Sequence, residues 1–87
     1  MKCFFYSDPA HGWLKVPKKL LTEFNIKDKI STYSYERNNY VYLEEDCDMS
    51  IFLDSAHNNS VRIDIIYNKQ SNKMSKIRSY NSYNKDK

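Results

Sequence analysis

The sequence predicts a small α+β domain in which two short helices pack on a mainly antiparallel sheet, in the order β-β-α-β-β-α-β. A chain of 87 residues is long enough for one hydrophobic core but not for two. Apolar and polar residues alternate over residues 61–67, as in a strand, while apolar residues recur at helical spacing over residues 49–56. We therefore expect one domain over residues 1–80, followed by a frayed basic tail over residues 81–87.

The first strand is expected at residues 2–6, where apolar side chains fall on both faces, as in the centre of a sheet. Pro9 and Gly12 then indicate a tight turn, because proline restricts φ and glycine accepts positive φ. A short extended return is expected at residues 13–16, so the chain begins with two neighbouring strands.

A first helix is predicted over residues 17–25. Pro17 suits the first helical position, because the N–H that it lacks has no partner there. Leu20 and Phe24 lie on one apolar stripe, and Asn25 is expected to end the helix in a left-handed conformation.

A hairpin is expected around Asn38 and Asn39, since asparagine tolerates the left-handed backbone of a two-residue turn. This register places four tyrosines on one face and Val41 and Leu43 on the other. The four tyrosines are Tyr33, Tyr35, Tyr40 and Tyr42, and the acidic run that follows contains Glu44, Glu45, Asp46 and Asp48.

The second helix follows the acidic run, with Asp46 or Asp48 expected to cap its N-terminus. Together with the strand at residues 61–67, it makes residues 40–67 a β-α-β unit with a parallel crossover. Residues 74–79 are compatible with a short edge strand. The expected core comprises Leu20, Leu21, Phe24, Met49, Phe52, Leu53, Val61, Ile63 and Ile65.

The net charge of +3 hides an asymmetry along the chain. Residues 1–67 carry eight Lys and Arg against ten Asp and Glu, whereas residues 68–87 carry six against one. The apolar run before Ser7 is too short for a signal peptide or a membrane span. Cys3 and Cys47 could form one disulfide, but nothing else resembles a secreted protein, so we expect reduced thiols and a cytoplasmic location in a bacterial host cell.

Neither a metal site nor a catalytic centre is predicted. The acidic run has the oxygen ligands of Mg²⁺ or Ca²⁺, but a strand end and a helix cap explain it, and it lacks a glycine-containing calcium loop. Cys3, His11, Cys47 and His57 do not have the spacing of a zinc finger. Cys47 and His11 are candidates for an enzyme, but the acidic neighbours of Cys47 disfavour a thiolate. We therefore expect no cofactor and no enzymatic activity.

The tyrosines and the acidic run form the predicted contact surface for another macromolecule. Tyrosine offers a large contact area with a polar tip, and clustered carboxylates attract a basic surface, such as one that binds nucleic acid. Two alternatives are that the tyrosines pack on a helix or form a homodimer interface. The predicted contact residues are Tyr33, Tyr35, Tyr40, Tyr42, Glu44, Glu45 and Asp46.

A second hypothesis is a nucleic-acid-binding module that uses the basic C-terminal segment. Glu36, Glu44 and Glu45 lie near the tyrosines in sequence, which disfavours base stacking on the tyrosine face. The candidate residues are therefore Lys69, Lys73, Lys76 and Arg78, assisted by Lys15, Lys18 and Lys19.

Three segments resemble small accessory proteins encoded by bacteriophages and mobile elements. They are SDPAHGWLKVP at residues 7–17, ISTYSYER at residues 30–37 and YVYLEEDCD at residues 40–48, within a similarity that spans about residues 4–54. Ala10 stands where these proteins commonly have glycine, and the turn at Asn38 replaces a glycine-containing one.

The resemblance implies a phage-type accessory protein, and many such proteins bind and inhibit host defence systems, including CRISPR effectors. The leading hypothesis is therefore a non-enzymatic protein that inhibits a bacterial defence complex through its tyrosines and carboxylates. The expected partner is a host protein or a ribonucleoprotein complex, and no membrane association is expected.

Overall fold

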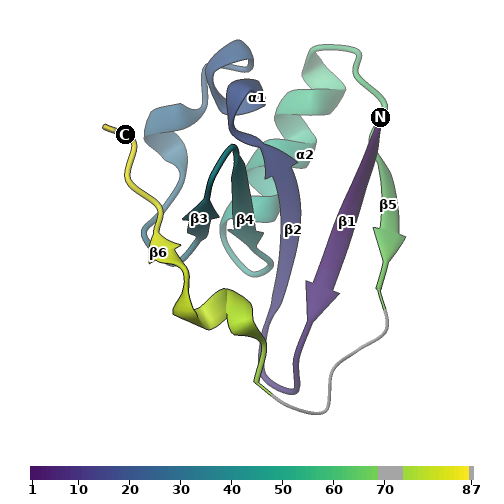
Figure 1. Ribbon diagram of the computed structural model, residues 1–87. Helices are drawn as coiled ribbons and strands as arrows, with labels where there is room; N and C mark the ends of the chain where they lie inside the picture. The colour runs from purple at the N-terminus through teal and green to yellow at the C-terminus, as the bar shows by residue number, and fades with distance from the viewer. Residues whose placement is uncertain (69–73, 87) are drawn as a thin grey trace.

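The computed structural model describes residues 1–68 and 74–86 and confirms an α+β fold (Figure 1). Among these residues, six strands form one mixed sheet in the order β5-β1-β2-β4-β3-β6. The strands are β1 (Lys2–Ser7), β2 (Gly12–Pro17), β3 (Tyr35–Arg37), β4 (Tyr40–Glu44), β5 (Asp64–Tyr67) and β6 (Asn81–Ser82). The helices are α1 (Lys18–Glu23) and α2 (Asp48–Asn58), with the 3₁₀ helices η1 (Lys27–Lys29) and η2 (Lys76–Ser79).

The sheet is mainly antiparallel, as predicted. Only the pair of β1 and β5 is parallel among the strand pairs of the described residues. The element order agrees with the prediction as far as β5, and η2 and β6 follow it. Strands β4 and β5 point the same way, so α2 does make a parallel connection, but β1 and β2 lie between the two strands.

Helix α1 is shorter than the predicted 17–25, and Pro17 is its extended N-cap and the last residue of β2 instead of the first helical residue. Pro17 precedes the helix with φ of −64°, and Asn25 adopts the left-handed φ of 57° that the sequence predicted. The next residue, Ile26, is buried, and its N–H donates a hydrogen bond of 2.9 Å to the carbonyl of Leu21. This arrangement satisfies a terminal carbonyl and turns the chain away from the helix.

The predicted carboxylate cap of α2 is wrong. Cys47 occupies the N-cap position and makes no capping hydrogen bond with its side chain. Asp48, the first helical residue, is instead buried and accepts hydrogen bonds from the backbone and hydroxyl of Ser31 and from the hydroxyl of Ser34. A buried carboxylate needs such donors, and here they tie the segment before β3 to the start of α2.

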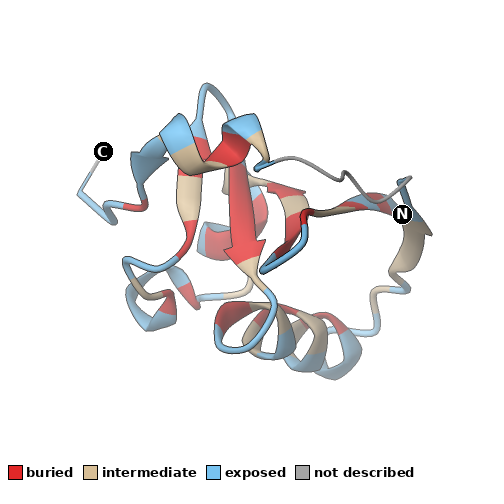
Figure 2. Ribbon diagram, turned by 90° about the horizontal axis from the view of Figure 1, so that it is seen from below, coloured by how far each residue is buried: buried red, intermediate tan, exposed pale blue. Residues whose placement is uncertain are grey.

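The main core lies between one face of the sheet and the helices (Figure 2). Of the predicted residues, Leu20, Leu21 and Phe52 are buried, Val61 is half-buried, and the rest are partly buried against the core. The predicted core omitted the residues of β1, β2 and β4. Helical spacing cannot identify them, and these strands carry apolar residues on both faces, so the core-facing side is not evident from the sequence. The buried strand residues of this core are Cys3, Phe5, Leu14, Val16, Val41 and Leu43.

A second, smaller apolar cluster covers part of the opposite face of the sheet. It contains Trp13, Tyr42 and Ile77, with partly buried tyrosines around them. Ile77 comes from η2, so the expected edge strand at residues 74–79 is wrong. The hydroxyl of Ser75 accepts a hydrogen bond from the N–H of Ile77, which starts a 3₁₀ turn and directs Ile77 onto the sheet.

The end of the chain is not frayed as predicted, at least over residues 81–84. Strand β6 pairs with β3, and Tyr83 is buried with an exposed fraction of 5%. The Tyr83 hydroxyl donates a hydrogen bond of 2.7 Å to the carbonyl of Lys27. The buried Tyr83 ring and the pairing of β6 with β3 together hold an otherwise polar segment against the core.

Gly12 does not have the positive φ that the turn was expected to require. It is needed instead for close packing. A Cβ at this position would overlap the ring of Phe5. We expect Gly12→Ala to lower the free energy of unfolding by about 1–3 kcal/mol in urea denaturation, with the exposed Ala10→Ser as the control. An unchanged midpoint would mean that the Phe5 ring moves aside without cost.

Candidate functional site

A pocket of about 440 Å³ lies where the turn before β2, the segment before β3, the β4–α2 loop and η2 meet. We call it the acidic pocket. It brings together four of the seven predicted contact residues: Tyr33, Tyr35, Glu44 and Asp46. The other lining residues are His11, Trp13, Cys47 and Arg78.

Aromatic rings form one wall of the acidic pocket. Trp13 is buried in the sheet, and its ring centre lies 6.3 Å from that of Tyr35 in an edge-on arrangement. Tyr33 has an exposed fraction of 71%, so its ring is available at the rim. The pocket thus combines a fixed aromatic wall with one accessible tyrosine.

Carboxylates form a further part of the lining, where Glu44 of β4 is the cross-strand partner of Trp13 on β2. Glu44 accepts a hydrogen bond of 2.9 Å from the backbone N–H of Cys47, which bends the β4–α2 loop back toward the strand. Glu45 and Asp46 are exposed in this loop. Within residues 1–68 and 74–86, none of these three carboxylates forms an ion pair. Their negative charge is therefore not compensated by the part of the chain that the structure describes.

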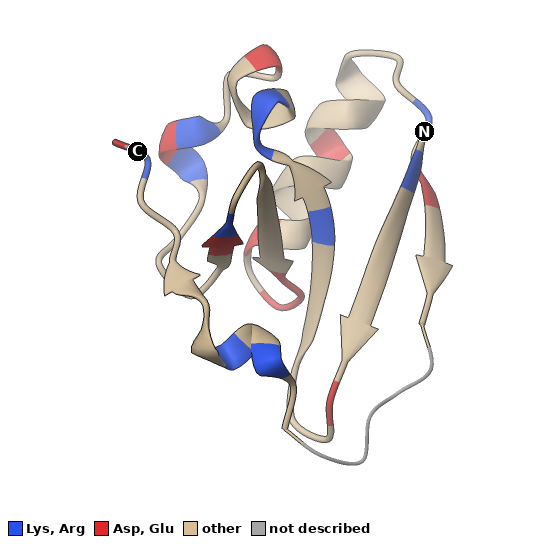
Figure 3. Cartoon of the chain, in the orientation of Figure 1, with Lys and Arg blue, Asp and Glu red and all other residues tan. Residues whose placement is uncertain are grey.

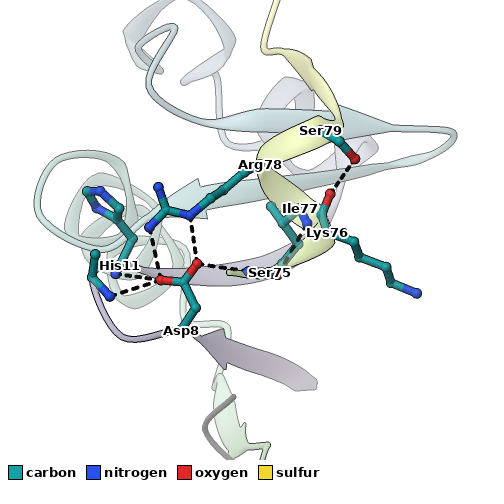
Figure 4. Close-up of polar contacts among 8 residues, drawn as sticks. Asp8, His11, Ser75, Lys76, Ile77, Arg78 and Ser79 are labelled. Carbon is teal, nitrogen blue, oxygen red and sulfur yellow. Dashed lines mark hydrogen bonds and ion pairs between the residues drawn. The ribbon is translucent and has the colours of Figure 1, made fainter. Parts of the chain in front are cut away.

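An ion pair joins the buried Asp8 to the half-buried Arg78, which lines the pocket from η2 (Figure 4). Asp8 Oδ2 accepts from Arg78 Nε at 2.7 Å, and Oδ1 accepts from Nη2 at 3.0 Å. The same carboxylate accepts backbone N–H groups of Ala10, His11 and Ser75. Arg78 foremost, and then these N–H groups, hold the pKa of Asp8 well below its usual range despite burial.

This ion pair changes the interpretation of Arg78 as a nucleic-acid contact. Its Nε and Nη2 are occupied by Asp8, and its guanidinium carbon lies 5.8 Å from the ring centre of Trp13. Arg78 therefore fastens η2 to the first turn through two of its three guanidinium nitrogens. Lys76 is exposed, and Lys69 and Lys73 lie outside the described residues.

The hairpin register is as predicted for Tyr35, Tyr40 and Tyr42, but Tyr33 lies in the turn before β3, and the tyrosine face is only partly exposed. Tyr35 pairs with Tyr42 and Arg37 with Tyr40, as the two-residue turn predicted, and Asn38 has φ of 55°. Tyr42, however, is buried with an exposed fraction of 8%, and burial raises its pKa to about 12. Tyr42 is therefore not a surface contact residue.

The burial of Tyr42 has a clear physical reason. Its ring centre lies 5.1 Å from that of Tyr80, which follows η2 in the chain, and 6.4 Å from that of Tyr6. The hairpin pattern cannot show that a distant segment will cover this face. Two other predicted residues lie outside the lining of the pocket: Tyr40, which is exposed at the turn end of β4, and Glu45, which is exposed in the β4–α2 loop.

Cys47 and His11, the two candidates for an enzyme, both line the acidic pocket. Desolvation of the thiol, and then the negative charge of Glu44, raise the pKa of Cys47, which disfavours the thiolate. Cys3 and Cys47 are both free, and Cys3 is buried.

In the described part of the chain, no group of three His, Cys, Asp or Glu side chains is placed to hold a metal ion.

Comparison with protein-family models, curated proteins and solved structures found no match for this chain. In the ranges 1–68 and 74–86, no helix has the length and apolar character required to cross a bilayer.

Proposed function

We propose that the protein is a non-catalytic binding protein whose acidic pocket receives a basic side chain of a protein partner. One observation carries this proposal: Tyr33, Tyr35, Glu44 and Asp46 converge on a single pocket of about 440 Å³. Pockets of a few hundred Å³ with few polar groups are typical of binding sites.

The chemistry of the lining favours a cation. A guanidinium or ammonium group entering beside Tyr33 and Tyr35 gains a cation–π contact, and Glu44 or Asp46 supplies a charge-assisted hydrogen bond. The positive charge of Arg78 is neutralised by Asp8, so this wall repels the incoming group only weakly. An anionic ligand would face the uncompensated carboxylates of the loop.

The partner that fits this site is a protein with an exposed basic surface, such as one that itself binds nucleic acid. A more specific proposal carries over the sequence hypothesis of a phage-type accessory protein. The protein would act in the bacterial cytoplasm, where it would inhibit a host defence complex by covering such a basic surface.

The proposal predicts that charge reversal of the acidic loop abolishes partner binding. Glu44→Lys, Glu45→Lys and Asp46→Lys should together remove the partner from affinity purifications of bacterial lysate and weaken binding of the purified partner at least about tenfold. The matched control reverses Glu23, Asp54 and Asp86, which are exposed outside the pocket. Thermal denaturation checks that both variants fold.

The aromatic wall gives an independent test. Tyr33→Ala should weaken the same complex, whereas Tyr67→Ala, at a tyrosine exposed to a similar degree on β5, should not. Wild-type affinity in the acidic-loop variant, or equal loss in its control, would refute the proposal.

A further inference from the structure

A second surface, rich in lysine, lies around α1, η1 and the C-terminal segment (Figure 3). Two hollows of about 150 and 380 Å³ adjoin there, since both are lined by Lys18 and Lys19. The smaller hollow adds Lys27 and Lys85, and the larger one adds Tyr40. We call this surface the lysine groove. It shares no lining residue with the acidic pocket.

The charge of the lysine groove is only partly compensated. Lys18 pairs with the buried Glu36 at 2.5 Å, so this lysine is held in place. Lys85 Nζ lies 3.8 Å from Asp28, but both side chains are exposed and such pairs are weak. Lys19 and Lys27 form no ion pair with any described residue. Neither hollow has a described Asp or Glu among its lining residues.

An accessible aromatic ring stands beside these lysines. Tyr40 has an exposed fraction of 41%, and Lys15 Nζ lies 4.2 Å from its ring centre. Glu36, a neighbour of Tyr40 in sequence, is buried and bonds Lys18 and the backbone N–H of Asn84. Glu44 lies at the opposite end of β4. The sequence argument against base stacking therefore does not apply to Tyr40.

We propose that the lysine groove binds a single-stranded nucleic acid. Lys19, Lys27 and Lys85 contact successive phosphates, and one base stacks on Tyr40. Lysines that track a backbone beside an exposed aromatic ring are the combination that sequence-tolerant single-strand binding requires. A phosphate group alone would account for the lysines but not for the tyrosine among them. This activity is additional to the proposed capture of a basic protein and uses different residues.

The test measures fluorescence anisotropy of labelled oligouridine and oligothymidine of about 20 nucleotides at about 50 mM salt. If three to four phosphates are neutralised, raising the salt to about 200 mM should weaken binding roughly 20- to 50-fold. Heparin serves as a polyanion without bases. Binding of heparin but of neither oligonucleotide, or no oligonucleotide binding at the lower salt, would overturn the proposal.

Two pairs of variants localise the site. Lys19→Glu with Lys27→Glu should weaken oligonucleotide binding at least about tenfold. Lys2→Glu with Lys76→Glu makes the same change in net charge at exposed positions outside the groove, and it should change binding less than about twofold. Equal losses in the two pairs would show a general charge effect and overturn the proposal.

Stacking is tested separately. Tyr40→Ala should weaken binding about fivefold or more, whereas Tyr33→Ala, in the acidic pocket, should leave it unchanged. Unchanged binding by Tyr40→Ala would overturn the assignment of the aromatic contact. Tyr33→Ala also separates the two surfaces, because it should affect only capture of the protein partner.

Discussion

Replacing Asp8 by alanine is expected to lower the free energy of unfolding by about 2–4 kcal/mol, because it removes a buried carboxylate that accepts hydrogen bonds from a half-buried guanidinium and from backbone N–H groups. The Asp8 side chain is fully buried and binds both Arg78 and three backbone N–H groups. Its removal leaves these donors without an acceptor and releases η2 from the first turn. Because small domains have a total free energy of unfolding of only about 5–15 kcal/mol, this loss is a large fraction of the stability.

Urea denaturation followed by tryptophan fluorescence measures this loss, because Trp13 lies beside the ion pair. Asp54→Ala, at an exposed position on α2, is the control and should change stability by less than about 0.5 kcal/mol. Equal midpoints for Asp8→Ala and wild type would mean that Arg78 and the first turn are held by other contacts.

The same carboxylate predicts a pH dependence. Because the pKa of Asp8 is lowered in the folded protein, the unfolded state binds its proton more readily. The stabilisation is therefore fully present above the ordinary carboxyl pKa of about 4 and is lost as the pH falls below it. The stability difference between wild type and Asp8→Asn should shrink between about pH 5 and pH 2. A constant difference over this range would contradict the assigned shift.

The second large effect is expected for Tyr83→Ala, which should lower the free energy of unfolding by about 3–5 kcal/mol. Tyr83 is the aromatic anchor of the C-terminal segment and a buried member of the main core, so its truncation leaves a cavity there. It also removes the donor to the carbonyl of Lys27. Tyr83→Phe keeps the ring and should cost only about 0.5–1.5 kcal/mol.

Thermal unfolding of the three proteins separates the contributions of ring and hydroxyl. Tyr67→Ala is a suitable control, because Tyr67 has an exposed fraction of 69%. If Tyr83→Ala melted at the wild-type temperature, the end of the chain would be frayed, as composition alone suggested.

The parts of the fold that depend on neighbours in sequence were predicted well. Pro17 and Asn25 bound α1, and the turn at Asn38 sets the register of β3 and β4, because each of these signals acts through local backbone geometry. The prediction of the α2 cap was wrong, because Asp48 accepts hydrogen bonds from Ser31 and Ser34, which are distant in sequence, and not from its own helix.

The site was predicted in part for the same reason. Tyr33, Tyr35, Glu44 and Asp46 were identified because aromatic and acidic residues cluster in one stretch of sequence. Trp13 and Arg78 were not predicted to line the pocket. Asp8 in the first turn was the signal for Arg78, because a carboxylate that becomes buried needs a basic side chain of the same chain to pair with.

The sequence by itself determined the α+β class, the hairpin register and the mixture of tyrosine and carboxylate at the β4–α2 loop. The spacing of apolar residues and the turn-forming residues act on neighbouring positions, so they predict the same helices, strands and turns however these elements pack together. The tertiary structure decided which tyrosines reach solvent, because Ile77 of η2 and the following Tyr80 pack with Tyr42 from the far end of the chain. Exposure depends on packing between distant segments, and no local pattern encodes which segment will cover a given face.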